Sequence, residues 1–301
     1  MSRTIMVGLD GSPESRAAAE WAAREATLRH VPVRLVHVWE PAPAHLAQAP
    51  LLGPETVQEW TEWIPREAAE GLALRHPGVD VTTVHKGGRP ADVLADAARD
   101  AELLVLGSRG LGGIAGFVVG SVGQAVVARA EAPVILVRAG EQAADEHAMD
   151  PSGIPSAATA FRPVLLGLDT RSHDDAVVSF AFEEAARRDT PLRVLHAWNL
   201  PPYNIYGLSD GVNLYDELVR AHAEELTDVL GPWRNKYPGV EVVEESRCGS
   251  PASHLVKGAR EASLIVVGRR IRHSPLGAHI GAVAHAVMHH AAAPVAVVAH
   301  P

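Results

Sequence analysis

The chain of 301 residues contains a single cysteine, Cys248, so no disulfide can form within it. A lone thiol without a disulfide is typical of a reducing compartment, and we expect a cytoplasmic protein. No apolar run approaches the roughly 20 residues that span a bilayer, so we expect no membrane contact. At the N-terminus Gly8, Asp10 and Gly11 interrupt any apolar core of a secretory signal, and we expect none.

Positive charge is also scarce. There are 27 Lys and Arg residues against 36 Asp and Glu residues, which gives a net charge of −9 at pH 7. A nucleic-acid partner needs basic surface to neutralise its phosphates, so we expect no nucleic-acid binding. The hydrophobic fraction of 47% is typical of a globular protein.

Internal repetition is the most informative property that the sequence does have. The segment "IMVGLDGS" (5–12) matches "VLLGLDTR" (164–171) at an offset of 159, and "GGRPADVL" (87–94) matches "CGSPASHL" (248–255) at an offset of 161. Three further blocks recur in the same order. The chain is therefore a tandem duplication of a unit of roughly 140 residues, a usual domain size.

This repetition predicts two domains, at residues 1–139 and 162–301. The intervening stretch, 140–161, is polar and rich in small residues, which is typical of a linker.

Within each unit, short Val/Ile/Leu-rich runs alternate with amphipathic stretches. In the first unit these runs are "TIMVGLD", "VRLVHVW", "DVTTVHK", "ELLVLG" and "PVILVR". They predict strands buried on both faces of a parallel sheet. The stretches between them predict helices at 12–30, 54–76, 90–100 and 120–130, and Pro65 is expected to kink or split the second. This alternation predicts an α/β fold with an open, doubly wound sheet, whose ligands bind at the carboxyl ends of the strands.

A glycine-rich loop follows the fourth predicted strand. Six glycines lie within fourteen residues: Gly107, Gly110, Gly112, Gly113, Gly116 and Gly120. Glycine lets a backbone bend sharply and approach a ligand closely, and Ser121 then opens a helix whose N-terminus favours an anion. Neither G-x-x-x-x-G-K-[ST] nor G-x-G-x-x-G is present. The loop therefore predicts a phosphate site of another type.

Gly107, Gly110, Gly120 and Ser121 spell G-x2-G-x9-G-[ST], with Asp10 after the first strand. This pattern resembles the ATP-binding signature of the universal stress protein family, and the resemblance covers both halves in the tandem form of that family. It implies an adenine-nucleotide alpha-hydrolase-like fold, with five parallel strands in the order 3-2-1-4-5. It also implies ATP with Mg²⁺ or Mn²⁺, and a nucleotide-dependent role in a stress or growth-arrest response.

The resemblance implies specific contacts in the first unit. Gly8 and Asp10 would line the nucleoside side, and the backbone of Val38 would face the adenine. The loop and the start of the next helix would hold the ribose and phosphates through Gly107, Ser108, Arg109, Gly110, Gly120 and Ser121. A divalent cation would be shared by phosphate oxygens and water, so no side chain is assigned as a metal ligand or as a catalytic group.

The second unit departs from this pattern. Ile271 stands at the second motif glycine, where a β-branched residue cannot readily take a positive φ, and Ala282 replaces the serine. Arginines in the loop add positive charge. This unit binds nucleotide differently, binds another anion, or is vestigial. Its candidate residues are Gly167, Asp169, Ala197, Gly268, Arg269, Arg270 and Gly281.

Two further patterns are interpreted as incidental. "GLSDG" (207–211) fits the nucleophile motif G-x-S-x-G, but it lies in a turn-rich loop and not between a strand and a helix. His285 and His289 have the spacing of a metal pair, but the carboxylate of H-E-x-x-H is missing. A solvated helix face is the simpler interpretation.

Three functions stay open. The first is an ATP-binding regulator, at most a slow ATPase, because no general base accompanies the loop. The second is an enzyme of a related fold, an ATP pyrophosphatase or adenylyl transferase, and the third is a dimerisation module without a ligand. The last strands, "APVILVR" (132–138) and "APVAVVA" (293–299), are candidate edges for pairing of the halves and for a homodimer formed through these strands or through domain faces. The regulatory protein partners are not predicted.

Overall fold

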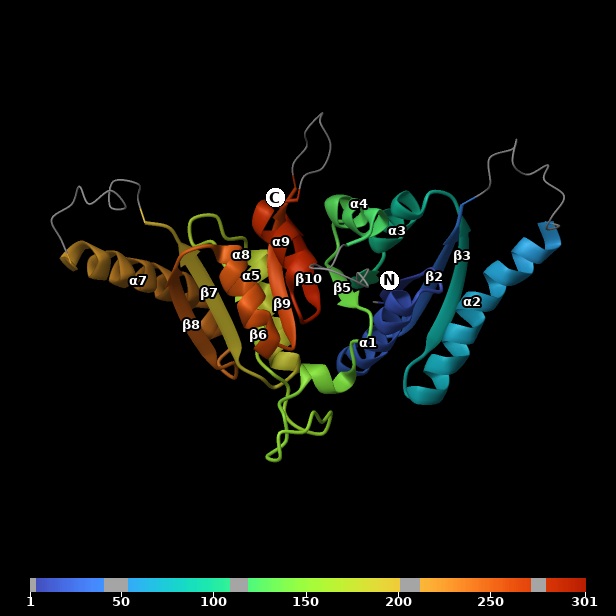
Figure 1. The fold of residues 1–301 in the computed structure, drawn as a ribbon, viewed down its shortest axis with the longest axis horizontal. Helices are drawn as coiled ribbons and strands as arrows, with labels where there is room; N and C mark the ends of the chain where they lie inside the picture. The colour runs from blue at the N-terminus through green and yellow to red at the C-terminus, as the bar shows by residue number, and fades with distance from the viewer. Residues whose placement is uncertain (1–3, 41–53, 109–118, 201–211, 272–279) are drawn as a thin grey trace. The chain divides into compact units, whose positions relative to one another are not determined.

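The computed structural model describes residues 4–40, 54–108, 119–200, 212–271 and 280–301 (Figure 1). The chain forms two compact units, Met1–Ala143 and Ala144–Pro301.

The first unit contains a five-stranded parallel sheet with the order β3-β2-β1-β4-β5. Its strands are β1 (Ile5–Leu9), β2 (Val33–Trp39), β3 (Val81–Gly87), β4 (Leu103–Ser108) and β5 (Val134–Arg138). Its helices are α1 (Pro13–Arg29), α2 (Pro54–Arg75), α3 (Pro90–Ala98) and α4 (Ser121–Arg129). The predicted fold class and strand order are confirmed. Strand–helix alternation with right-handed crossovers leaves few other arrangements.

Local sequence explains where α1 begins and ends. Ser12 is its N-cap, and the Ser12 hydroxyl accepts a hydrogen bond from the backbone N–H of Ser15 at 3.1 Å. Pro13 occupies the first turn, where its missing N–H has no consequence. The helix ends at His30, whose φ of 55° is left-handed.

Two expectations for the first unit are wrong in part. β1 is fully buried, but most residues of β3 are exposed, as an edge strand rich in Thr, His and Lys allows. α2 runs without interruption through Pro65, so the predicted split does not occur.

The second unit repeats the architecture with the order β8-β7-β6-β9-β10, again all parallel. Its strands are β6 (Val164–Gly167), β7 (Leu192–Trp198), β8 (Val242–Cys248), β9 (Leu264–Arg270) and β10 (Val295–His300). Its helices are α5 (Asp175–Arg187), α7 (Val212–Lys236), α8 (Pro251–Gly258) and α9 (Ala282–His290), with short 3-10 turns at Ala143–Glu146 and Ala259–Glu261. Among the described helices, none has the length and apolarity to cross a bilayer.

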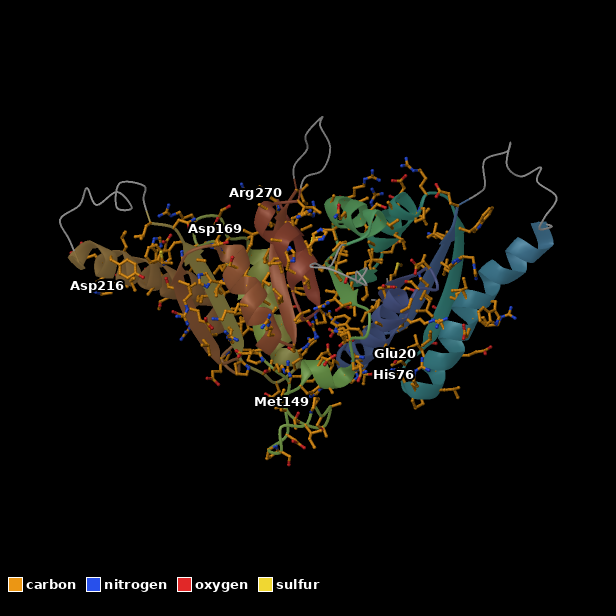
Figure 2. All side chains as sticks on the ribbon, in the orientation of Figure 1. Glu20, His76, Met149, Asp169, Asp216 and Arg270 are labelled. Carbon is orange, nitrogen blue, oxygen red and sulfur yellow. The ribbon has the colours of Figure 1, made fainter. Side chains whose placement is uncertain are left out.

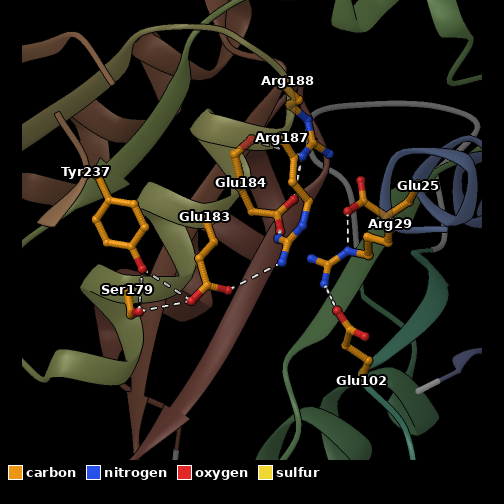
Figure 3. A network of polar contacts seen from close by, with 9 residues as sticks. All are labelled: Glu25, Arg29, Glu102, Ser179, Glu183, Glu184, Arg187, Arg188 and Tyr237. Carbon is orange, nitrogen blue, oxygen red and sulfur yellow. Dashed lines mark hydrogen bonds and ion pairs between the residues drawn. The ribbon is translucent and has the colours of Figure 1, made fainter. Parts of the chain in front are cut away.

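Buried ion pairs hold each unit together internally (Figure 3). In the first unit Arg29, at the end of α1, pairs with Glu25 at 2.5 Å and with Glu102, which precedes β4. In the second unit the buried Glu184 pairs with Arg187 at 2.7 Å and with Arg188. The Arg29 contacts connect the end of α1 to the start of β4.

Candidate functional site

A cavity of about 490 Å³ opens at the carboxyl ends of β1 and β4 in the first unit. Cavities of roughly 300–1,000 Å³ are usual for small-molecule sites, and the reversal of strand order is where doubly wound sheets bind ligands. Six of the nine predicted first-unit residues line it: Gly8, Asp10, Val38, Gly107, Gly120 and Ser121. The predicted motif is therefore brought together around one space.

The remaining three predicted residues are placed differently. Ser108 is buried, and its hydroxyl donates to the Val137 carbonyl at 3.1 Å, so its side chain is used inside the fold. Arg109 and Gly110 lie outside the described residues.

Gly107 has a packing requirement that no other residue type meets. A Cβ atom built on Gly107 would lie 2.5 Å from the Glu14 carbonyl carbon and 2.7 Å from the Ser15 backbone nitrogen. These are main-chain atoms at the start of α1, and they cannot swing aside as a side chain could. A Cβ on Gly8 would meet the Leu106 side chain at 2.6 Å. Glycine at both positions lets backbone form the wall of the cavity.

Asp10 is held in place at the end of β1. Its Oδ1 accepts hydrogen bonds from the Ser12 backbone N–H at 3.0 Å and from the Ser12 hydroxyl at 2.5 Å. This is an Asx turn, which aims the carboxylate at a fixed position beside the cavity. Ser12 and Ser15 also line the cavity, although the motif did not identify them. Ser12 is the N-cap of α1, so the capping pattern at the start of this helix is the signal that could have identified it.

The N-terminus of α4 faces the same cavity. Its N-cap, Gly120, offers no side-chain acceptor, and no acidic residue stands in the first turn. The first N–H groups of a helix have no partner within the helix and carry partial positive charge. Since Gly120, Ser121, Val122 and Gly123 line the cavity, this helix end can receive an anion.

His37 lies behind the cavity, on the opposite side of β2 from the cavity-lining Val36 and Val38. Burial lowers the pKa of His37, His85 lowers it further, and Asp10 acts in the other direction. His37 is therefore a neutral buried imidazole at pH 7 and not a binding cation.

The second unit has a matching cavity of about 420 Å³. Six of its seven predicted residues line it: Gly167, Asp169, Ala197, Gly268, Arg270 and Gly281. The seventh, Arg269, is buried and does not line the cavity, because neighbouring residues of β9 face opposite sides of the sheet. Asp169 and Arg270 lie at the same end of the unit (Figure 2).

The charges at the second cavity differ from those at the first. The N-cap of α5 is Asp174, which accepts from the Ala176 N–H at 2.8 Å and lines the cavity, whereas α1 has the neutral Ser12. His300 lies 3.9 Å from Asp174, and Arg270 donates to the Ser172 hydroxyl. The second cavity thus has a carboxylate where the first has a hydroxyl, and its negative charge repels a polyphosphate.

Fold and site together define a class: a tandem pair of doubly wound α/β units, each with a glycine-lined cavity at the carboxyl ends of its strands. The universal stress protein family model matches residues 1–138 and 160–299, and the chain belongs to this family.

A sequence relative that spans nearly the whole chain agrees with this assignment. A universal stress protein of Mycolicibacterium smegmatis is 32% identical over 306 residues, which cover 98% of this chain and 96% of the relative. The solved structure of a universal stress protein from Archaeoglobus fulgidus has the same fold, with a TM-score of 0.70 and 18% identity over 100% of both chains. A universal stress protein solved in complex with cAMP matches 46% of this chain and 98% of its own, at 30% identity and a TM-score of 0.35.

Proposed function

We propose that the first unit binds ATP with a divalent cation on its phosphates, and that nucleotide occupancy regulates the protein in a stress or growth-arrest response. The observation that carries this proposal is the assembly of Gly8, Asp10, Gly107, Gly120 and Ser121 around one cavity. The missing Cβ atoms leave room for a ligand against bare backbone, and an uncapped helix end supplies the N–H donors.

The lining of the cavity suits the two ends of a nucleotide. Val36, Val38 and Leu94 provide an apolar surface for a base, and backbone groups of Val38 can read its edge. The start of α4, with the Ser121 hydroxyl, provides donors for phosphates. Mg²⁺ or Mn²⁺ would bridge phosphate oxygens and water, near the fixed carboxylate of Asp10.

The same lining argues against efficient catalysis. Among the described residues around this cavity, the ionisable side chains belong to Asp10 and Glu14, and neither histidine, lysine nor cysteine stands there. Phosphate release slower than about 1 s⁻¹ is therefore expected, below an ordinary enzyme rate. Transfer of AMP to an acceptor would favour the alternative of an adenylyl transferase.

The test is titration of the purified full chain with ATP and Mg²⁺ by calorimetry. One site per chain is expected, and Ser121→Ala should weaken ATP binding about tenfold, the effect of losing one hydrogen bond to a charged group. Ala282→Ser, at the equivalent position of the second unit, is the matched control. It should leave the affinity of the first unit for ATP unchanged. A parent protein that binds no ATP at millimolar concentration refutes the proposal.

The proposal extends to setting and assembly. A cytoplasmic location follows from the lone Cys248, and a homodimer formed through the last strands or through domain faces follows from their apolar edges. Sedimentation of the purified chain with and without ATP measures the assembly.

A further inference from the structure

Two histidines and a glutamate converge in the second unit, outside its cavity. They are His196 on β7 and His222 and Glu225 on α7, and one ligand atom from each lies within 4.8 Å of the others. Nε2 of His196 is 3.3 Å from Nδ1 of His222, which is 3.5 Å from Oε2 of Glu225. Within the described part of the chain, no other group of three His, Cys, Asp or Glu side chains converges in this way.

This cluster, His196–His222–Glu225, is separate from the nucleotide cavity. Leu195 and Ala197 line the cavity, whereas His196 between them does not. Successive side chains of a strand point to opposite faces, so His196 faces α7 on the other side of the sheet. The family motif therefore gives no account of the cluster.

The spacing of the two imidazole nitrogens matches a tetrahedral metal site. Zn²⁺ binds imidazole nitrogen at about 2.0–2.1 Å, so two nitrogens at a tetrahedral angle lie roughly 3.3–3.4 Å apart. The two histidines of the cluster already have this separation. We propose that His196, His222 and Glu225 bind a divalent transition metal, with Zn²⁺ the best fit and water as the fourth ligand.

The surroundings hold both rings in the required orientation. Nδ1 of His196 lies 3.2 Å from the Leu168 carbonyl and donates to it, which leaves the Nε2 lone pair directed at His222. The indole of Trp198 stacks on the His222 ring, with centroids 4.6 Å apart and planes inclined by 17°. Such supporting contacts around metal-binding histidines fix the tautomer and the ring position.

Access to the cluster also suits a metal. His196 is buried, whereas the Glu225 side chain is 36% exposed and leaves a path for the ion.

The competing explanation is a metal-free chain in which Nδ1–H of His222 donates to His196. The first unit offers the comparison for this. His37 stands at the position of His196, on the equivalent strand, and its neighbour is His85, with ring centroids 5.6 Å apart. No third ligand joins them among the described residues. The first-unit pair is therefore a control for histidine content on the equivalent strands.

The experiment is titration of chelator-treated, full-length protein with Zn²⁺ against a chromophoric competitor, with Co²⁺ absorption as a second probe. One tight site per chain and the intense visible bands of tetrahedral Co²⁺ are expected. His222→Gln and Glu225→Gln should each weaken binding at least 10-fold, since even supporting residues contribute 10–100-fold. His85→Gln, in the first-unit pair, and His285→Gln, at an exposed position of α9, should leave the affinity unchanged.

Three results overturn the proposal: no Zn²⁺ site in the parent protein, equal affinity in the parent and in the His222 and Glu225 variants, or the weak bands of octahedral Co²⁺. These two variants change partly exposed side chains, and far-UV circular dichroism confirms that they fold. The outcome does not depend on ATP, so failure of the nucleotide proposal leaves this test intact.

Discussion

The close approach of Gly107 to α1 predicts a large difference between two equivalent glycines. In Gly107→Ala the new methyl group meets the Glu14 carbonyl carbon at 2.5 Å and the Ser15 nitrogen at 2.7 Å. In Gly268→Ala, the matched change in the second unit, the nearest atoms are side-chain atoms of His300 at 3.1 Å and of Val177 at 3.3 Å. Main chain must move in the first case, and side chains can yield in the second.

The magnitude follows from these contacts. Forcing extra volume into a packed interior destabilises by about 1–3 kcal/mol. Moving the start of α1 also disturbs the Ser12 cap, which contributes about 1 kcal/mol. We therefore expect Gly107→Ala to lose about 3 kcal/mol and Gly268→Ala less than about 1 kcal/mol. For a unit of this size 3 kcal/mol lowers the Tm by about 10 °C.

Because two units unfold in one chain, a single two-state curve is not a safe measurement. Hydrogen exchange followed by mass spectrometry reads α1 and α5 separately. A loss of 2 kcal/mol or more should speed exchange in α1 by about 30-fold or more in Gly107→Ala. Exchange in α5 should hardly change in Gly268→Ala. Equal protection of α1 in the parent and in Gly107→Ala would refute the reasoning.

Three further outcomes are expected. Replacing Arg29 with Met removes the guanidinium paired with the buried carboxylate of Glu25 and should destabilise the first unit by about 3 kcal/mol, measured by hydrogen exchange in α1 with Arg16→Met, at an exposed pair, as the control. Burial raises the pKa of Glu20, but hydrogen bonds from Arg75 and His76 outweigh this and hold it below its ordinary value (Figure 2). This contribution to stability is therefore complete above about pH 5 and is lost as the pH falls through the lowered pKa. Glu20→Gln should therefore reduce the acid sensitivity of the urea concentration at which α1 loses its protection from hydrogen exchange. Ser12→Ala should lose about 1 kcal/mol, read from the same loss of protection at pH 7.

The sequence predicted the sheet and most of the first cavity for identifiable reasons. Alternation of apolar runs with helices, together with the handedness of crossovers, predicts a doubly wound parallel sheet, and the resemblance of the glycine motif to the family signature supplied the strand order. Gly107, Gly120 and Ser121 are close in sequence to the end of β4, and Asp10 ends the neighbouring strand β1. Local spacing was therefore sufficient to bring them together.

The metal cluster could not be predicted in this way. His196 and His222 belong to a strand and to the helix that follows it, and their contact depends on which face of α7 packs toward β7. That register comes from the packing of the helix as a whole. The exposure of β3 had a signal in Thr82, Thr83 and Lys86, which apolar content alone concealed.

In the first unit, α1 and β4 are fastened to each other at both ends. Gly107 presses against the first turn of the helix, and Arg29 in its last turn is paired with Glu102 just before the strand. The helix and the strand therefore have a fixed relative position both at the cavity and at the opposite edge of the sheet.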